Sequence, residues 1–259
     1  ATQSFVKVDY GPEGLKLMEA GLSAQDALDR LVEADPGRAV RQVGMVDGSG
    51  NSAVYTGDNC IEFAGHKKGK HYTVQANIMA SPTVWPLMAM TFETTEGDLA
   101  DRMMKTLEVA QSEGGDLRGK QSASILIVSG NPTGVSWKDV VMDLRVEDHP
   151  EPLKQLKRLV RIHRAYKHAN VGDLYMETGD IEKALIEYDL SVGFYPENPE
   201  LKYWTAVALV GKGRLEKALP IFKEVFSRAP QLKTLTPRVV SSGLIPKDSV
   251  LVEKIMRVE

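Results

Sequence analysis

Two amide side chains lie close together in the segment TVQANIMAS, residues 73–81. Gln75 and Asn77 are separated by one residue, so in a β-strand they project from the same face. An amide in an apolar stretch either finds hydrogen-bond partners within the protein or serves a ligand. In the second case its N–H groups suit an oxyanion or the carbonyl of a substrate amide. We therefore identify Asn77 as a candidate catalytic residue and Gln75 as a candidate substrate-binding residue.

A second polar cluster lies in the segment GGDLRGKQSAS, residues 114–124. Glycines surround Asp116, Arg118, Gln121 and Ser122, and an apolar strand follows them. Asp116 and Arg118 could form only a surface ion pair, which would contribute little to stability. Charged groups among flexible glycines also fit a loop that faces a ligand. In that interpretation Asp116 and Ser122 are candidate catalytic residues, and Arg118 and Gln121 bind substrate.

Other residue types that could do chemistry lack suitable neighbours. His66 in AGHKKGKH has no carboxylate nearby in the sequence, so we expect a loop histidine that at most contacts substrate. The single cysteine, Cys60, has no activating neighbour and fits a small buried apolar residue. The sequence contains neither the Cys and His spacing of zinc sites nor a phosphate-binding glycine loop. We therefore expect no metal and no cofactor.

The elements that would position these residues come in blocks. Residues 10–37 predict two short helices, with Ser23 as the N-cap of the second. Residues 38–57 alternate apolar and polar positions around DGSGN, which predicts a β-hairpin. A strand, two helices within about 82–113 and two more strands follow. Blocks of this kind, without strict alternation of strand and helix, predict an α+β layered sandwich for residues 1–148.

Residues 151–259 contain an internal repeat, in which GDIEKAL recurs as GRLEKAL 34 residues later. The same offset brings Tyr188 onto Phe222. The period and the pattern of small and aromatic residues resemble the tetratricopeptide repeat. Two units alone bury little core, so we expect an all-α helical domain capped by flanking helices at about 151–166 and 248–257. This module would bind a protein partner or form a homodimer.

Bulk properties argue against several functional classes. The net charge of −3 does not support nucleic-acid binding. The basic segment KQLKRLVRIHRAYKH fits a solvated helix whose Leu156, Leu159 and Val160 face inward. No apolar run approaches the roughly 20 residues of a transmembrane helix, so we expect no membrane association. A single cysteine fits a reducing compartment, and we expect a cytoplasmic protein.

Four segments follow one another in chain order: ATQSF with YGPEGLKLMEAGLSAQDAL, then ADPGRAVRQVGMVD, YTGDNCIEFAGHKKGKHYTVQANIMA and GGDLRGKQSASILIV. Together they resemble one family, which is catalogued as domain of unknown function 1028 and is placed among the N-terminal-nucleophile (Ntn) hydrolases. The resemblance covers about residues 1–145 and implies a four-layer αββα sandwich that hydrolyses an amide bond in active members. It further implies that Gln75 and Asn77 lie where oxyanion donors lie, and that Asp116 and Ser122 support the nucleophile.

In Ntn hydrolases a Thr, Ser or Cys at the free N-terminus attacks the substrate, and its own α-amine accepts the proton. Ala1 has no nucleophilic atom, and the nitrogen of Thr2 is in a peptide bond. We therefore expect the nucleophile upstream of Ala1, with Thr2 and Gln3 as substrate-contacting walls of a cleft. The predicted function is hydrolysis of a small amide or peptide-like substrate. The alternatives are a non-catalytic scaffold on a degenerate hydrolase fold and binding at the cell envelope.

Overall fold

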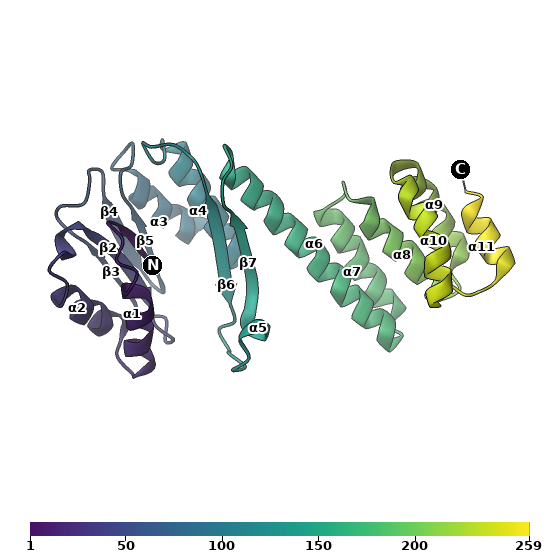
Figure 1. Ribbon diagram of the computed structural model, residues 1–259, viewed down its shortest axis with the longest axis horizontal. Helices are drawn as coiled ribbons and strands as arrows, with labels where there is room; N and C mark the ends of the chain where they lie inside the picture. Colours follow the sequence, from purple (N-terminus) through teal and green to yellow (C-terminus); the bar gives the residue numbers. More distant parts are fainter. Residues whose placement is uncertain (259) are drawn as a thin grey trace. The chain divides into compact units, whose positions relative to one another are not determined.

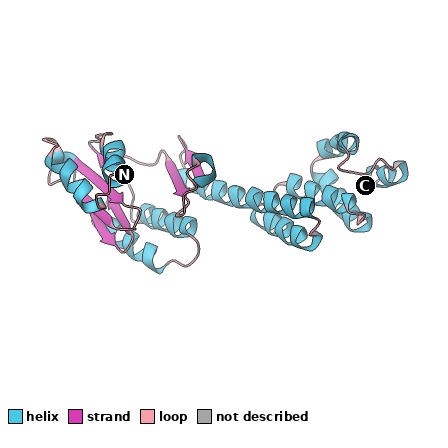
Figure 2. Cartoon of the chain, turned by 90° about the horizontal axis from the view of Figure 1, so that it is seen from below, coloured by secondary structure: helices cyan, strands magenta, loops and turns pink. Residues whose placement is uncertain are grey.

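The chain forms two compact units, Ala1–Lys157 and Arg158–Glu259, and the computed structural model describes residues 1–258. The first unit mixes helices with small antiparallel sheets, and the second is built from helices (Figures 1 and 2). The predicted change from α+β to all-α along the chain is therefore confirmed. The boundary between the units falls inside helix α6 (Pro152–Thr178), a few residues after the position expected from the sequence.

Two short helices, α1 (Tyr10–Glu19) and α2 (Ala24–Glu33), begin the first unit after strand β1. The Ser23 hydroxyl accepts a hydrogen bond from the Asp26 amide at 3.1 Å, so the predicted N-cap is confirmed. A buried stripe on α2, including Leu28, packs on the first sheet.

The first sheet is antiparallel with the order β1-β2-β3. Its strands are β1 (Thr2–Ser4), β2 (Arg41–Val46) and β3 (Ser52–Thr56), with a short 3₁₀ helix, η1 (Arg38–Val40), before β2. In the β2–β3 turn the Asp47 carboxylate accepts hydrogen bonds from two backbone amides, as turn residues of this type do. The predicted hairpin is therefore confirmed.

A second antiparallel pair, β4 (Gly65–Gly69) and β5 (Tyr72–Ala76), lies on the other face of this sheet. The loop predicted at His66 is wrong, because His66 lies within β4 and pairs with Gln75 of β5. The sequence HKKGKH did not indicate a strand. Lys67 and Lys68 are both exposed, whereas a half-buried strand usually alternates buried and exposed residues.

Helix α3 (Val84–Thr94) covers the outer face of β4 and β5, and α4 (Leu99–Ser112) packs against α3. Tyr72 and Val74 face these helices in one apolar core, and Thr73 and Gln75 face the first sheet. The packing order is therefore helices, sheet, hairpin, helices (Figure 1). This order places the side chains of Gln75 and its neighbours between two β-layers.

The first unit ends with the antiparallel pair β6 (Ala123–Val128) and β7 (Val140–Val146), joined through the short helix α5 (Ser136–Asp139). Ile125 and Met142 supply its buried residues. Both strands were expected from the sequence.

The second unit consists of the rest of α6 and the helices that follow it (Figure 2). It has its own apolar core. The helix expected at 151–166 does not end there, because no proline interrupts the chain before Thr178. Tyr188 and Phe222, the aromatic residues of the repeat, are both buried. The remaining helices are α7 (Ile181–Phe194), α8 (Pro199–Gly211), α9 (Leu215–Arg228), α10 (Pro230–Ser242) and α11 (Ser249–Met256).

Within residues 1–258, no helix is long and apolar enough to cross a membrane. In the same residues no group of three or more His, Cys, Asp and Glu side chains is arranged to hold a metal ion.

Candidate functional site

The side chain of Gln42 is the centre of a polar cluster between the two β-layers. It is fully buried on β2, directly opposite Gln3 of β1. Its Nε2 atom lies 3.1 Å from the carbonyl oxygens of both Gly65 and Ala76. Its Oε1 atom accepts hydrogen bonds from Gln3 Nε2 at 2.5 Å and from Asn77 Nδ2 at 3.2 Å. Every polar atom of this buried amide therefore has a partner.

These contacts fix the orientation of three amides. A backbone carbonyl only accepts hydrogen bonds, so the group of Gln42 that faces Gly65 and Ala76 must be its NH₂. Its oxygen must then face Gln3 and Asn77, and both of these side chains must present their NH₂ groups to it. Asn77 keeps one Nδ2 hydrogen and its Oδ1 oxygen, for which no partner occurs in the described chain.

The cluster extends to a Thr–His pair on its other side. Gln42 Nε2 also lies 2.9 Å from Thr56 Oγ1, so its two hydrogens are shared among three acceptors. Thr56 Oγ1 lies 2.8 Å from His66 Nδ1. Burial, followed by the charge of Lys67, lowers the pKa of His66. A neutral His66 can accept a hydrogen bond from the Thr56 hydroxyl at Nδ1, which completes a continuous chain of hydrogen bonds from Asn77 to His66.

Backbone hydrogen bonds attach the glycine-rich loop to the segment after β5. The Leu117 amide donates to the Ile78 carbonyl at 3.0 Å, and the Ala80 amide donates to the Gly115 carbonyl at 3.0 Å. Met79 and Asp116 form an isolated antiparallel bridge. Gly115 has a φ of +65°, a conformation that glycine adopts readily. The two polar segments singled out in the sequence are thus brought side by side.

Asp116 and Arg118 form a bidentate pair within this loop. Arg118 Nε and Nη2 donate to the two carboxylate oxygens of Asp116 at 2.9 and 2.6 Å, and the Arg118 amide donates to Oδ1 at 2.8 Å. These hydrogen bonds hold the pKa of Asp116 below its ordinary value. The two parallel hydrogen bonds fix the orientation of the guanidinium, and the carboxylate balances its charge.

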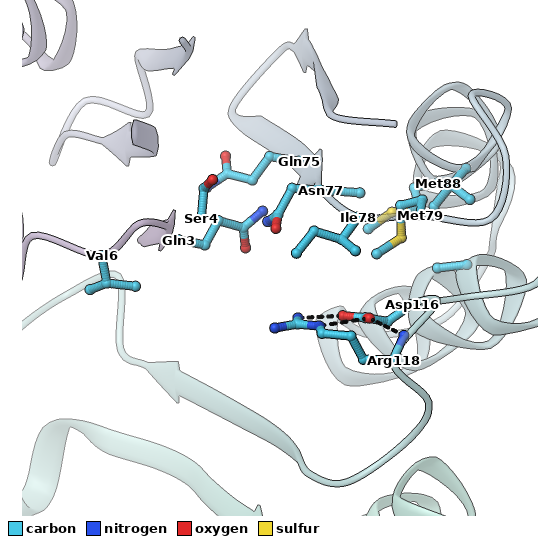
Figure 3. Close-up of a pocket in the computed structure, with 13 residues that line it drawn as sticks. Gln3, Ser4, Val6, Gln75, Asn77, Ile78, Met79, Met88, Asp116 and Arg118 are labelled. Atoms are coloured by element: carbon cyan, nitrogen blue, oxygen red, sulfur yellow. Dashed lines mark hydrogen bonds and ion pairs between the residues drawn. The ribbon is translucent and has the colours of Figure 1, made fainter. Parts of the chain in front are cut away.

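Both segments line one cavity of about 440 Å³, which we call the amide pocket. In Figure 3 the amides of Gln3 and Asn77 lie on one side of it, and the Asp116–Arg118 pair lies on the other. Apolar side chains, among them Ile78 and Met79, lie between the two polar sides. Its full lining is Gln3, Ser4, Val6, Gln75, Ala76, Asn77, Ile78, Met79, Val84, Met88, Ala110, Asp116 and Arg118.

Two residues of the amide pocket have unusual backbone conformations. Ser4 and Ile78 have φ values of +68° and +57°. This left-handed region is costly for a β-branched residue, by about 1–3 kcal/mol. Strain of this kind is concentrated at ligand sites, so its presence at two pocket residues adds to the case for a functional cavity.

A neighbouring cavity of about 430 Å³, the loop pocket, accommodates the rest of the glycine-rich segment. Gln121 and Ser122 line it, together with Asp116 and Arg118, which it shares with the amide pocket. Lys120, also in its lining, is paired with Glu151 at 2.8 Å.

Two of the predicted site residues lie outside both pocket linings. Thr2 is on β1, and its hydroxyl is buried without a hydrogen-bond partner among the described residues. His66 contacts Thr56 at the far end of the polar cluster. Gln3, Gln75, Asn77, Asp116 and Arg118 are brought together in the amide pocket, whereas Gln121 and Ser122 lie in the loop pocket.

Gln42 is a site residue that was not predicted from the sequence. The signal was present in the strand RQVGMV, where Gln42 and Gly44 share the face opposite to the apolar Val43 and Met45. A Cβ atom at Gly44 would collide with the Gln75 side chain, so the small residue makes room for the second layer. A buried glutamine beside an obligatory glycine indicates a polar layer between sheets.

The arrangement suits recognition of a secondary amide. Such a group presents one carbonyl acceptor and one N–H donor, and Asn77 offers one free N–H and one free oxygen. Because Gln42 holds Asn77 in place, little side-chain freedom would be lost on binding.

Comparisons with known proteins relate the first part of the chain to one family. The model of a family of unknown function, DUF1028, matches residues 1–156. A solved structure from Silicibacter pomeroyi, of the same family, is 24% identical with a TM-score of 0.53. That alignment covers 62% of this chain and 70% of the other, and shows a shared fold. A search of curated proteins found no match.

Proposed function

We propose that this chain, which belongs to the DUF1028 family of unknown function, binds a small amide-containing molecule in the amide pocket and takes part in its hydrolysis. The observation that carries the proposal is the orientation of Asn77. Its free N–H would donate to the carbonyl oxygen of the ligand amide, and its Oδ1 would accept from the ligand N–H. An N–H directed at the carbonyl oxygen would also stabilise the negative charge that develops there during hydrolysis.

The packing order of helices, sheet, hairpin and helices supports an Ntn-hydrolase-like αββα sandwich for the first unit. In that class the attacking group is a Thr, Ser or Cys at a free N-terminus, with its α-amine as the base. Asn77 would then serve the carbonyl oxygen, and Gln42 would act as a positioning residue behind it. Asp116 would orient Arg118 at the opposite wall.

A direct test uses a panel of N-acetylated amino acids, with binding followed by NMR and hydrolysis by acetate release. Asn77→Ala is expected to weaken binding about tenfold or more, since hydrogen bonds in a desolvated site are worth about 1–3 kcal/mol. Gln25→Ala is the matched control, because Gln25 is an exposed amide on α2 that bonds only Asp29. Binding that is unchanged in Asn77→Ala would rule the amide site out. Binding without acetate release, in a protein that carries a free N-terminal Thr, Ser or Cys, would favour the non-catalytic alternative.

A separate observation favours a binding role for the second unit. Helices α6 and α8 line a cavity of about 620 Å³ that contains apolar side chains, among them Trp204 and Leu244. Asp173 and Glu177 stand at the same cavity. We propose that this tetratricopeptide-like module binds a protein segment, from a partner or from a second copy of the chain. Trp204→Ala is expected to abolish pull-down of that partner and leave the first unit unaffected.

A further inference from the structure

Asp116 occupies only one side of the Arg118 guanidinium. It accepts from Nε and Nη2, and within residues 1–258 no group accepts from Nη1. The Arg118 side chain is 70% exposed. The edge formed by Nη1 and the second hydrogen of Nη2 therefore stays available. An edge of this shape binds a carboxylate through two parallel hydrogen bonds.

The pocket offers no competing anion at this edge. Asp116 and Arg118 are the only charged residues among the described residues that line the amide pocket. Both carboxylate oxygens of Asp116 are already engaged on the Nε side of the guanidinium. Asp116 therefore holds the Arg118 guanidinium in one orientation. The N–H donors on its free edge are then already oriented when a carboxylate binds.

Arg118 and the amide side chains line the same cavity from opposite walls (Figure 3). A molecule that satisfies both walls carries an amide at one end and a carboxylate at the other. Ile78, Met79 and Met88 line the space between them, so an apolar substituent fits beside that connection. An N-acylated amino acid has these three features on adjacent atoms.

We propose that the substrate class of the amide pocket is N-acyl amino acids and short peptides with a free carboxylate, and that Arg118 is the residue that recognises this carboxylate. The proposal rests on the proposed function, in which Asn77 binds the amide of the same molecule. It adds a charge requirement that amide binding alone does not impose.

The chain contains a matched control for Arg118. The tripeptide Asp-Leu-Arg occurs twice, at Asp116–Arg118 and at Asp143–Arg145. Arg145 makes the same fork, with Nε and Nη2 3.0 and 3.2 Å from the carboxylate oxygens of Asp143. Arg145 lies on β7 and lines neither the amide pocket nor the loop pocket. Arg145→Gln therefore removes an equivalent charge and ion pair away from the site.

The experiment compares N-acetyl-L-methionine with its uncharged analogue N-acetyl-L-methioninamide, titrated into the full chain and followed by ¹H–¹⁵N NMR. The acid is expected to bind about tenfold more tightly than the amide to the wild type and to Arg145→Gln, because a charge-assisted pair of hydrogen bonds is added. Arg118→Gln is expected to bind the two ligands with equal affinity. The spectra of both variants also report whether the fold is intact.

The possible results separate the two proposals. Equal affinity of the wild type for acid and amide overturns the role of Arg118 and leaves the amide site standing. A preference for the acid that persists in Arg118→Gln also overturns it. Absence of shifts at Asn77 with either ligand overturns both the carboxylate site and the proposed function.

Discussion

The Oε1 atom of Gln42 accepts a hydrogen bond from Asn77 Nδ2 at 3.2 Å, across the space between two β-layers. The backbone carbonyls of Gly65 and Ala76 fix which end of Gln42 faces Asn77. A fully buried residue therefore determines which atoms of a pocket residue remain free for a ligand.

Replacing Gln42 by Glu should damage both stability and binding. A carboxylate cannot donate to the carbonyls of Gly65 and Ala76, and a buried negative charge that faces two acceptor oxygens is strongly unfavourable. We expect a loss of about 3 kcal/mol in the free energy of unfolding, measured with urea. Gln231→Glu, at an exposed position on α10, should change it by less than about 0.5 kcal/mol. Equal effects of the two changes would contradict the assigned role of Gln42.

Asp35 is a second buried polar group whose contribution to the free energy of unfolding can be measured. It is 3% exposed and accepts hydrogen bonds from Arg41 Nε at 3.0 Å and from Tyr10 Oη at 3.1 Å. Asp35→Ala should lower the free energy of unfolding by about 2 kcal/mol, since it leaves these donors unpaired. Glu13→Gln removes an exposed ion pair with Lys16 and should cost less than about 0.5 kcal/mol.

The same carboxyl predicts a pH dependence. Burial works against ionisation of Asp35, but hydrogen bonds from Arg41, Gly37 and Tyr10 outweigh it and lower its pKa. Its contribution is therefore present above the unfolded carboxyl pKa of about 3.9 and is lost as the pH falls below it. Urea titrations between pH 3 and pH 6 should show a steeper loss in the wild type than in Asp35→Ala. Parallel curves would be inconsistent with this assignment.

His66 should destabilise the first unit in mild acid. Burial and then Lys67 lower its pKa, so the folded state binds fewer protons than the unfolded state near the ordinary histidine pKa of about 6.5. Stability is then complete above that pH and decreases as the pH falls below it. An NMR titration of the His66 Cε1–H signal should show a midpoint below 6.5, and the urea midpoint of His66→Gln should depend less on pH than that of the wild type. A midpoint at or above 6.5 would refute this interpretation.

Much of the first unit could be predicted because its signals are local. The Ser23 cap, the Asp47 turn and the α3–α4 pair follow from a few adjacent residues, and the structure confirms them. Strand β4 could not be predicted in this way, since its Lys67 and Lys68 are exposed and only pairing with β5 defines it.

The same distinction between local and long-range signals explains which residues of the candidate site could be predicted. Gln75, Asn77, Asp116 and Arg118 were singled out because polar residues in apolar or glycine-rich settings are visible in a single segment. Gln42 was missed, because its partners come from segments 14 to 39 residues distant in the sequence. Which amide donates and which accepts is a property of that tertiary network.

The two glycines of neighbouring helices in the second unit provide a final, paired prediction. A Cβ atom at Gly172 of α6 would lie 2.6 Å from Cε1 of Tyr188, whose hydroxyl is anchored to Asp173 at 2.7 Å. At Gly193 of α7 no atom lies within 4 Å of the added Cβ. Neither glycine has a positive φ, so backbone strain does not distinguish them.

Gly172→Ala should therefore destabilise the second unit by about 1–3 kcal/mol, because the anchored ring of Tyr188 cannot move aside without losing its hydrogen bond. Gly193→Ala should stabilise it by about 0.5–1 kcal/mol, because alanine lowers the conformational entropy cost of the helix. Amide hydrogen exchange of α6 and α7 measures both changes in the intact chain. Opposite signs are expected, and a stabilising Gly172→Ala would show that α6 does not pack against the Tyr188 ring as described.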